Sequence, residues 1–170
     1  GQSLQCNELE KGYFNSGVLL INTLAWAQES VSAKAMSMLA DKAIVSRLTY
    51  MDQDILNLIL LGKVKFIDAK YNTQFSLNYE LKKSFVCPIN DETVLIHYVG
   101  PTKPWHYWAG YPSAQPFIKA KEASPWKNEP LMRPVNSNYA RYCAKHNFKQ
   151  NKPINGIMNY IYYFYLKIIK

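Results

Sequence analysis

Apolar and polar residues in the first part of the chain are arranged in a pattern that predicts a short strand followed by a helix. The apolar run Val18–Ile21 is too short for a helix of its own and predicts a buried strand over residues 16–22. Asn22 and Thr23 are favoured helix N-caps. The segment after them is rich in Ala, Met, Leu and Gln and predicts a helix over residues 24–42.

The same order of elements recurs further along. Asp52 is a candidate N-cap for a second helix, which Gly62 ends. The apolar face of that helix consists of Ile55, Leu56, Ile59 and Leu60. Short strands are predicted over residues 64–67 and 93–97. Because strand and helix patterns alternate, the sequence predicts an α/β fold built on a layered sheet.

The pattern changes after Gly100, because prolines recur at positions 101, 104, 112, 116, 125, 130 and 134. Proline cannot donate a backbone hydrogen bond, so this spacing excludes long helices and central strands and predicts an extended, aromatic-rich wrap over residues 101–134. Helical patterns return at Asn136, break at Pro153 and then resume. The last helix has one narrow polar stripe, at Gly156, Asn159, Tyr163, Lys167 and Lys170.

The length of 170 residues indicates one ordinary domain or part of a larger one. A hydrophobic content of 48% can support a real core. The formal net charge is +8 and is unevenly spread. Residues 1–100 carry 9 Lys and Arg against 10 Asp and Glu, whereas residues 101–170 carry 11 against 2. This basic, aromatic part is typical of a surface for nucleic acid, anionic lipid or a phosphorylated substrate; a solvated basic face without a partner is the alternative.

Three cysteines, Cys6, Cys87 and Cys143, lie far apart without a C-x-x-C spacing, so we expect free thiols and a reducing compartment. The first twelve residues are polar and lack the apolar core of a signal peptide, and the beginning without an initiator Met suggests a fragment. No run reaches the roughly 20 apolar residues that a membrane-spanning helix needs.

Two polar clusters adjoin predicted elements. Asn15 and Gly17 precede the first strand, where Gly allows close backbone approach to a ligand and Asn offers a donor and an acceptor; a plain turn is the alternative. Asp52, Gln53 and Asp54 open the second helix. Capping explains one carboxylate there but not two acids and a glutamine together, and a D-x-D pair can also hold a divalent metal. Capping and function both stay open for this cluster.

A third cluster is the stretch HYVGPTKPWHYW, residues 97–108. His97 ends a predicted strand, where one ring nitrogen can bind a metal while a neighbour orients the other. Gly100 lets backbone N–H groups approach an anion, and Lys103 is a point charge suited to phosphate. The prolines stiffen the turn, and the tryptophans can wall off a sugar or a base. A structural histidine is the alternative, but the three-residue steps indicate a diphosphate–metal site.

The segments NSGVLLIN, DQDILN and HYVGPTKPW, in this order, resemble the second half of a family 8 glycosyltransferase catalytic domain. The resemblance is greatest to bacterial lipopolysaccharide core hexosyltransferases of the 1,3-galactosyl- or glucosyltransferase type. YPSAQPFIKAKEASPWKN and the basic helical end resemble the C-terminal extension of that group. The resemblance implies the second half of a nucleotide-diphospho-sugar transferase (GT-A-like) α/β fold over residues 1–108. It implies a helical, basic extension over residues 109–170.

Carried onto this sequence, the resemblance makes His97 a ligand of Mn²⁺ (or Mg²⁺), which bridges the diphosphate of a UDP-hexose. Gly100 and Lys103 would contact the same diphosphate. The family's own metal-binding D-x-D lies in its N-terminal half and is not seen here, and the acids at 52–54 belong to a different motif. The chain is therefore expected to be the C-terminal half of a longer enzyme and to be inactive alone.

The resemblance also assigns residues to the sugar. Asp52 would hydrogen-bond the transferred hexose, Gln53 would lie under its anomeric carbon, and Asn15 and Gly17 would line the donor sugar pocket. Ser16 departs from the family, which usually has Ala there. The family retains anomeric configuration, and a glutamine is a poor nucleophile. A front-face route, in which a UDP oxygen takes the acceptor proton, is therefore favoured over a covalent intermediate of the glycosidase kind.

The expected function is transfer of glucose or galactose from a UDP-sugar to the lipopolysaccharide core, by an enzyme lying peripherally on the cytoplasmic face of the anionic bacterial inner membrane. The expected partners include no nucleic acid. The alternative is a basic aromatic module that binds nucleic acid or anionic membrane without catalysis. Aliphatic strands and tyrosines on a terminal helix argue against an RNA-binding platform. An inert regulatory fragment is a third reading. Two placements of the terminal helix stay open: it contacts the membrane, or it packs on the protein core.

Overall fold

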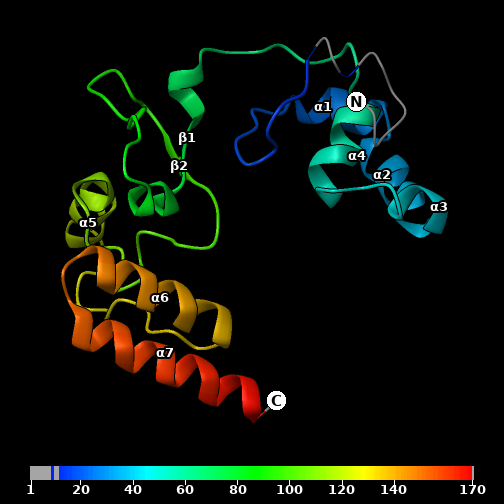
Figure 1. Ribbon diagram of the computed structural model, residues 1–170. Coiled ribbons are helices and arrows are strands. Elements are labelled where there is room, and N and C mark those ends of the chain that lie inside the picture. The colour runs from blue at the N-terminus through cyan, green and yellow to red at the C-terminus, as the bar shows by residue number, and fades with distance from the viewer. Residues whose placement is uncertain (1–8, 10–11, 170) are drawn as a thin grey trace. The chain divides into compact units, whose positions relative to one another are not determined.

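The computed structural model describes residues 9 and 12–169, which form two compact units, the first ending at Ala69 and the second beginning at Lys70. Figure 1 shows helices in both units and a small sheet in the second. In the described part of the chain, the fold is therefore mixed, with helices and one short parallel sheet. Of the cysteines, Cys87 and Cys143 carry free thiols. Cys6 lies outside the described residues.

Short helices make up most of the first unit. They are α1 (Thr23–Gln28), α2 (Val31–Ala40), α3 (Lys42–Val45) and α4 (Met51–Ile59). Helix α2 contacts each of the other three, and its Val31 is buried. Helix α4 buries Ile55 together with two polar residues, Asp54 and Asn57. A small core with buried polar groups therefore holds this unit.

The helix predicted over residues 24–42 is broken into α1 and α2. Asn22 caps α1 as predicted, because its side-chain oxygen accepts from the Ala25 N–H at 3.1 Å. Ser30 then adopts a left-handed conformation with φ 52°, which ends the first helix before the second begins. Serine competes with the helix by hydrogen-bonding to nearby backbone, so a break at this position has a local cause.

Helix α4 matches the prediction in extent but not in its cap. Tyr50 is the N-cap, and the prediction of Asp52 in that role is wrong. The Asp54 carboxylate instead reaches back and accepts from the backbone N–H groups of Thr49 and Tyr50, at 2.7 and 2.8 Å. Gly62 follows the helix and has φ 72°, a conformation that favours glycine. This agrees with the prediction that Gly62 ends the helix.

The strands predicted over residues 16–22 and 64–67 are wrong. Neither segment has strand structure, and both are largely exposed, with Leu20 99% and Ile67 60% accessible. An apolar run becomes a strand only when another segment satisfies its backbone N–H and C=O groups. Among the described residues no segment pairs with either run.

The second unit contains short strands and 3₁₀ turns followed by helices. In order these are η2 (Ala69–Asn72), β1 (Thr73–Phe75), η3 (Leu77–Leu81), β2 (Ile96–Tyr98), η4 (Pro112–Ala114), α5 (Gln115–Glu122), α6 (Ser137–Lys149) and α7 (Pro153–Ile168). Strands β1 and β2 pair in parallel. The strand predicted over 93–97 is thus displaced toward the C-terminus, and β1 was not predicted.

The core of the second unit lies beside this sheet. It consists of Phe75, Leu77, Ala109, Tyr111 and Ala114, all buried. Helix α6 adds a buried face at Ala140, Cys143 and Ala144. Residues from the strands, η3 and the proline-rich stretch therefore share one core. Helix α6 is joined to it by the hydrogen bond between Tyr111 OH and His146 Nδ1 at 2.7 Å.

The proline-rich stretch is not extended throughout. Helix α5, of 8 residues, interrupts it, so the prediction of an extended wrap is wrong over residues 115–122. Pro116 lies in the first turn of α5, where the missing N–H would have had no partner in the helix. Elsewhere the stretch is fastened by backbone hydrogen bonds from Tyr107 N–H to the Met132 carbonyl and from Met132 N–H to the Trp105 carbonyl, at 3.1 and 2.8 Å.

Helices α6 and α7 confirm the predicted helical end and its break at Pro153. They lie side by side and run in opposite directions (Figure 1). Asn136 caps α6 by accepting from the Tyr139 N–H at 2.8 Å. Gly156 is buried against the Phe148 ring, which a Cβ would approach to 2.6 Å. The polar stripe predicted on α7 therefore begins with a packing contact to α6.

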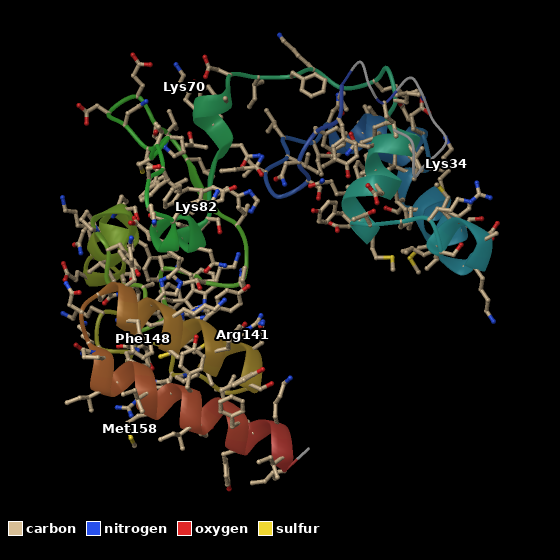
Figure 2. The ribbon with its side chains drawn as sticks, viewed as in Figure 1. Lys34, Lys70, Lys82, Arg141, Phe148 and Met158 are labelled. Carbon is tan, nitrogen blue, oxygen red and sulfur yellow. The ribbon has the colours of Figure 1, made fainter. Side chains whose placement is uncertain are left out.

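The outward face of α7 is apolar rather than polar. Its exposed large hydrophobic residues are Ile154, Ile157, Met158, Ile161, Tyr162, Phe164, Tyr165 and Ile168. Met158 points away from α6 (Figure 2). Of the predicted stripe, Asn159 and Tyr163 are half-buried, and Lys170 lies outside the described residues. Among the helices in the described part of the chain, none is both long and apolar enough to span a membrane.

Candidate donor-sugar and diphosphate sites

The first unit brings together the four residues that the sequence assigned to the sugar. Asn15 Nδ2 donates to Gln53 Oε1 at 2.9 Å, and the Ser16 N–H donates to the same oxygen at 3.2 Å. Ser16 Oγ donates to Asp52 Oδ2 at 2.9 Å, and the Gly17 N–H donates to Asn15 Oδ1 at 3.0 Å. The turn before the mispredicted strand therefore docks on the first turn of α4.

A second layer of hydrogen bonds supports this cluster. Tyr13 OH donates to Asp54 Oδ1 at 2.5 Å and accepts from Gln53 Nε2 at 3.0 Å. Burial and the bond to Asp54 raise the pKa of Tyr13 to about 12. Burial would raise the pKa of Asp54, but hydrogen bonds from Tyr13 and from the backbone of Tyr50 and Thr49 outweigh it and hold that pKa below its ordinary value. Asp54 is therefore an ionised, fully engaged anchor at neutral pH.

Asn57 completes the anchoring of the turn. Its side chain accepts from the Phe14 N–H at 2.8 Å and donates to the Phe14 carbonyl at 2.8 Å and to the Gln53 carbonyl at 2.8 Å. The roles of Tyr13 and Asn57, and the anchoring role of Asp54, were not predicted from the sequence. The available signal was an asparagine among apolar neighbours on a helix, since a buried amide needs partners.

The second unit places His97, Gly100 and Lys103 together at the end of β2. His97 Nδ1 lies 3.0 Å from Asn72 Oδ1. An amide oxygen only accepts, so Nδ1 carries the proton and the Nε2 lone pair is available. Burial, and then the Lys103 charge, lower the pKa of His97. The ring is therefore neutral at physiological pH, which is the form that ligates metals.

Gly100 and Lys103 shape the loop that follows. Gly100 has φ 81°, and a Cβ there would lie 2.8 Å from Ser76 Oγ. Lys103 Nζ donates to the Tyr98 carbonyl at 2.6 Å, and burial lowers the pKa of this ammonium. An ammonium has three donors, so the bond to Tyr98 leaves Lys103 able to bind an anion.

A complete metal centre is not formed by the residues that the structure describes. Within residues 9 and 12–169 no group of three or more His, Cys, Asp or Glu side chains is placed to hold a metal. His97 fits a metal in its tautomer, its neutrality and its orienting partner Asn72. It fits as one ligand only, so a metal here would need further ligands.

Two open surface cavities lie apart from the predicted site residues. One, of about 480 Å³, is lined by Tyr107, Pro130, Leu131, Arg133, Asn155, Met158 and Asn159. The other, of about 390 Å³, is lined by Lys34, Ser37, Met38, Leu58 and Ile59. Neither contains a residue that the sequence analysis assigned to the donor.

Comparison with known proteins gives matches over nearly the whole chain. Residues 1–109 match the family described as glycosyl transferase family 8, and residues 111–167 match glycosyl transferase family 8 C-terminal. Lipopolysaccharide glucosyltransferase WaaO of Escherichia coli K12 is 54% identical over 98% of this chain and 49% of its own length. Lipopolysaccharide 1,3-galactosyltransferase of Salmonella typhimurium LT2 is 51% identical over 99% of this chain and 50% of its own length.

A further relative, a lipopolysaccharide 1,2-glucosyltransferase of Escherichia coli, is 40% identical over 95% of this chain and 49% of its own length. The chain thus spans about half the length of these three curated relatives. No solved structure matches it significantly.

Proposed function

This chain belongs to glycosyl transferase family 8, and on that premise we propose that the whole protein is a retaining transferase that moves glucose or galactose from a UDP-hexose to the lipopolysaccharide core. Relatives whose names state lipopolysaccharide glucosyl- and galactosyltransferase activity support the proposal. The observation that carries it is the cluster that joins Asn15 and Gly17 to Asp52 and Gln53 by hydrogen bonds. A GT-A-like fold and a division into residues 1–108 and 109–170 belong to the same proposal.

In this proposal Asp52 binds the transferred hexose and Gln53 lies beneath its anomeric carbon. The Gln53 amide is fixed by hydrogen bonds to Asn15, Ser16 and Tyr13, so it needs no reorganisation during the reaction. An amide is a poor nucleophile, which favours a front-face route with an ion pair. The carbonyl dipole then stabilises positive charge at the anomeric centre, and a UDP oxygen takes the acceptor proton.

The loop after β2 binds the leaving diphosphate in the same proposal. The Lys103 ammonium and the backbone at Gly100 contact its oxygens, and His97 offers Nε2 to Mn²⁺ or Mg²⁺. A bound divalent metal supplies charge neutralisation for the departing UDP. Asn72 keeps the His97 proton on Nδ1, which leaves Nε2 bare for that role.

We also propose that the protein is peripheral on the cytoplasmic face of the anionic inner membrane. The apolar outer face of α7 supports this, since Ile154 is 76% exposed and Ile168 83% exposed. Lys145, Lys149 and Lys152 precede α7 in the sequence, and Lys167 lies in its last turn. An exposed apolar helix face in a segment rich in lysine suits an anionic lipid surface.

Steady-state kinetics of the whole protein with UDP-glucose or UDP-galactose and a lipopolysaccharide core acceptor test the function. His97→Ala and Lys103→Ala should each lower turnover roughly 10²- to 10³-fold, because each removes charge stabilisation of the leaving group. Gln53→Ala should lower turnover with less effect on UDP binding. Lys119→Ala, which removes an exposed lysine of α5, is the control and should match the wild type. Wild-type turnover in Gln53→Ala would refute the role given to that residue.

The 170-residue chain alone should bind Mn²⁺–UDP weakly and transfer no sugar, because His97 is its one expected metal ligand. Isothermal titration calorimetry of this chain with UDP, in the presence and absence of Mn²⁺, checks that expectation. Micromolar, Mn²⁺-dependent binding would contradict it.

A further inference from the structure

His146 of α6 is a buried polar residue that reaches three other parts of the second unit. It is fully buried. Its Nδ1 lies 2.7 Å from Tyr111 OH, and its Nε2 lies 3.1 Å from Thr102 Oγ1 and 3.1 Å from Asn78 Oδ1. Helix α6 is thereby hydrogen-bonded to the loop after β2, to η3 and to the segment before η4.

The partners of His146 define its tautomer. The Asn78 side-chain oxygen only accepts, so Nε2 carries the proton and shares it between Asn78 and Thr102. Nδ1 then accepts from the Tyr111 hydroxyl. Burial lowers the pKa of His146 to about 4, so the ring is neutral with both nitrogens satisfied. Such a group gives one fixed donor and one fixed acceptor inside the core.

Thr102 lies between Gly100 and Lys103, the two residues proposed to contact the diphosphate. Its side chain is fully buried, in contrast to the exposed Gly100. Two further bonds fold the loop, from the Lys103 N–H to His106 Nδ1 at 3.1 Å and from the His106 N–H to the Lys103 carbonyl at 3.0 Å. Those two bonds are within the loop. The Thr102 hydroxyl attaches the loop to α6 beside Gly100 and Lys103, and further along Tyr107 OH accepts from Cys143 Sγ of α6 at 3.0 Å.

We propose that His146 is a positioning residue of the donor site, which holds Thr102 and thereby places the Gly100 backbone and the Lys103 ammonium where the UDP diphosphate binds. This inference rests on the proposed function of the loop. It gives the C-terminal region a part in donor binding, separate from any contact with membrane or acceptor. Tyr111 and Asn78 orient His146, and His146 orients Thr102.

The test compares Thr102→Val with Thr102→Ser in the whole protein. Valine keeps the shape of threonine and removes the hydroxyl, whereas serine keeps the hydroxyl. One hydrogen bond of about 1 kcal/mol corresponds to about five-fold in affinity. We expect Thr102→Val to raise the KM for UDP-hexose and the Kd for UDP at least about five-fold, with the KM for the acceptor unchanged. Thr102→Ser should restore both donor constants.

Tyr111→Phe provides a second variant in case Thr102→Val does not fold. It removes the donor to Nδ1, frees the His146 tautomer, and should raise the KM for UDP-hexose in the same direction. Donor KM and UDP Kd equal to wild type in a folded Thr102→Val, or in Tyr111→Phe, would overturn the inference. So would a loss of thermal stability in Thr102→Val with no change in the donor constants.

Lys103→Ala separates this inference from the proposed function. If Lys103→Ala raises the KM for UDP-hexose while Thr102→Val does not, the loop binds the diphosphate as proposed, but His146 has no positioning role. If Lys103→Ala leaves both donor constants unchanged, the loop does not bind the diphosphate. The proposed function then fails at this loop, and the inference fails with it.

Discussion

Gly100 shows how a single residue can set the course of a loop. Its φ of 81° lies in the region that side chains other than glycine's rarely adopt, and Ser76 Oγ leaves no room for a Cβ. Both constraints act at the point where β2 gives way to the proposed diphosphate loop. A change here affects the backbone before it affects any side chain of the site.

Gly100→Ala should destabilise the second unit by at least about 1 kcal/mol, because alanine is strained at positive φ. Contact with Ser76 Oγ adds to that cost. The double variant Gly100→Ala/Ser76→Ala should recover the part of the stability loss that comes from the steric contact. It should keep the part that comes from backbone strain. Urea unfolding followed by tryptophan fluorescence measures both. Equal stability of Gly100→Ala and the wild type would show that the loop tolerates another conformation.

At the scale of elements, the first turn of α4 has two acids with different environments. Asp52 is exposed and contacts Ser16, whereas Asp54 is buried and accepts from Tyr13, Thr49 and Tyr50. One acid is therefore available to a ligand, and the other holds the turn and the helix start together. This arrangement separates the structural role from the proposed catalytic role within a single motif.

Asp54→Ala should lower the free energy of unfolding of the first unit by about 2–4 kcal/mol, because it leaves backbone donors and the Tyr13 hydroxyl without their acceptor. Asp52→Ala is the matched control and should change the free energy of unfolding by less than about 1 kcal/mol. Chemical denaturation of the two variants, followed by circular dichroism, checks the difference. Equal losses would mean that Asp54 does not anchor the turn.

The exposed apolar face of helix α7 leads to a prediction about membrane binding. Because its inner face packs on α6, substitution is a cleaner test than deletion. Ile161→Glu/Ile168→Glu should reduce flotation of the whole protein with anionic phospholipid vesicles at least about ten-fold, since it places charge in the apolar face. Val86→Glu changes an exposed apolar residue outside α7 and should leave flotation unchanged. Flotation that neither the double variant nor ~0.5 M salt reduces would exclude α7 as the contact.

At the scale of the whole molecule, two buried histidines make stability depend on pH. Burial, followed by nearby charges, lowers the pKa of His146 and of His106 to about 4, from 6.5. The charges that face them are Lys103 and Lys145, and His146 also faces His106 itself. The unfolded chain binds protons at these positions below about pH 6.5, whereas the folded chain does so only below about pH 4.

Stability should therefore fall as pH decreases from about 6.5 toward 4, by up to about 1.4 kcal/mol per pH unit for each histidine. Above pH 6.5 both states are neutral at these positions, and they contribute no pH dependence. Urea midpoints between about pH 7 and pH 5 measure the slope. His106→Gln should reduce the slope without abolishing it, because His146 and His97, whose pKa burial also lowers, still contribute. A flat profile over this range would mean that these rings do not stay neutral in the folded chain.

Local features were predicted from the sequence because their physics is local. The Asn22 cap, Gly62 after α4, the α6 helix and the break at Pro153 depend on bonds and dihedral angles within a few residues. Sequence also marked residues 97–103 as unusual for a turn. The resemblance assigned roles there and in the Asp52–Gln53 motif, and those roles stay predictions.

The tertiary structure decided what depends on distant partners. The runs at 16–22 and 64–67 are apolar enough for strands, but no described segment supplies the hydrogen bonds that would make them so. The bonds from Tyr13 to Asp54 and from His146 to Thr102 join residues about 40 positions apart. Sequence by itself determined which residues could cap, turn or carry charge. Only the tertiary structure decided which of them are in contact, because a buried polar group needs a hydrogen-bond partner, and that partner can be distant in sequence.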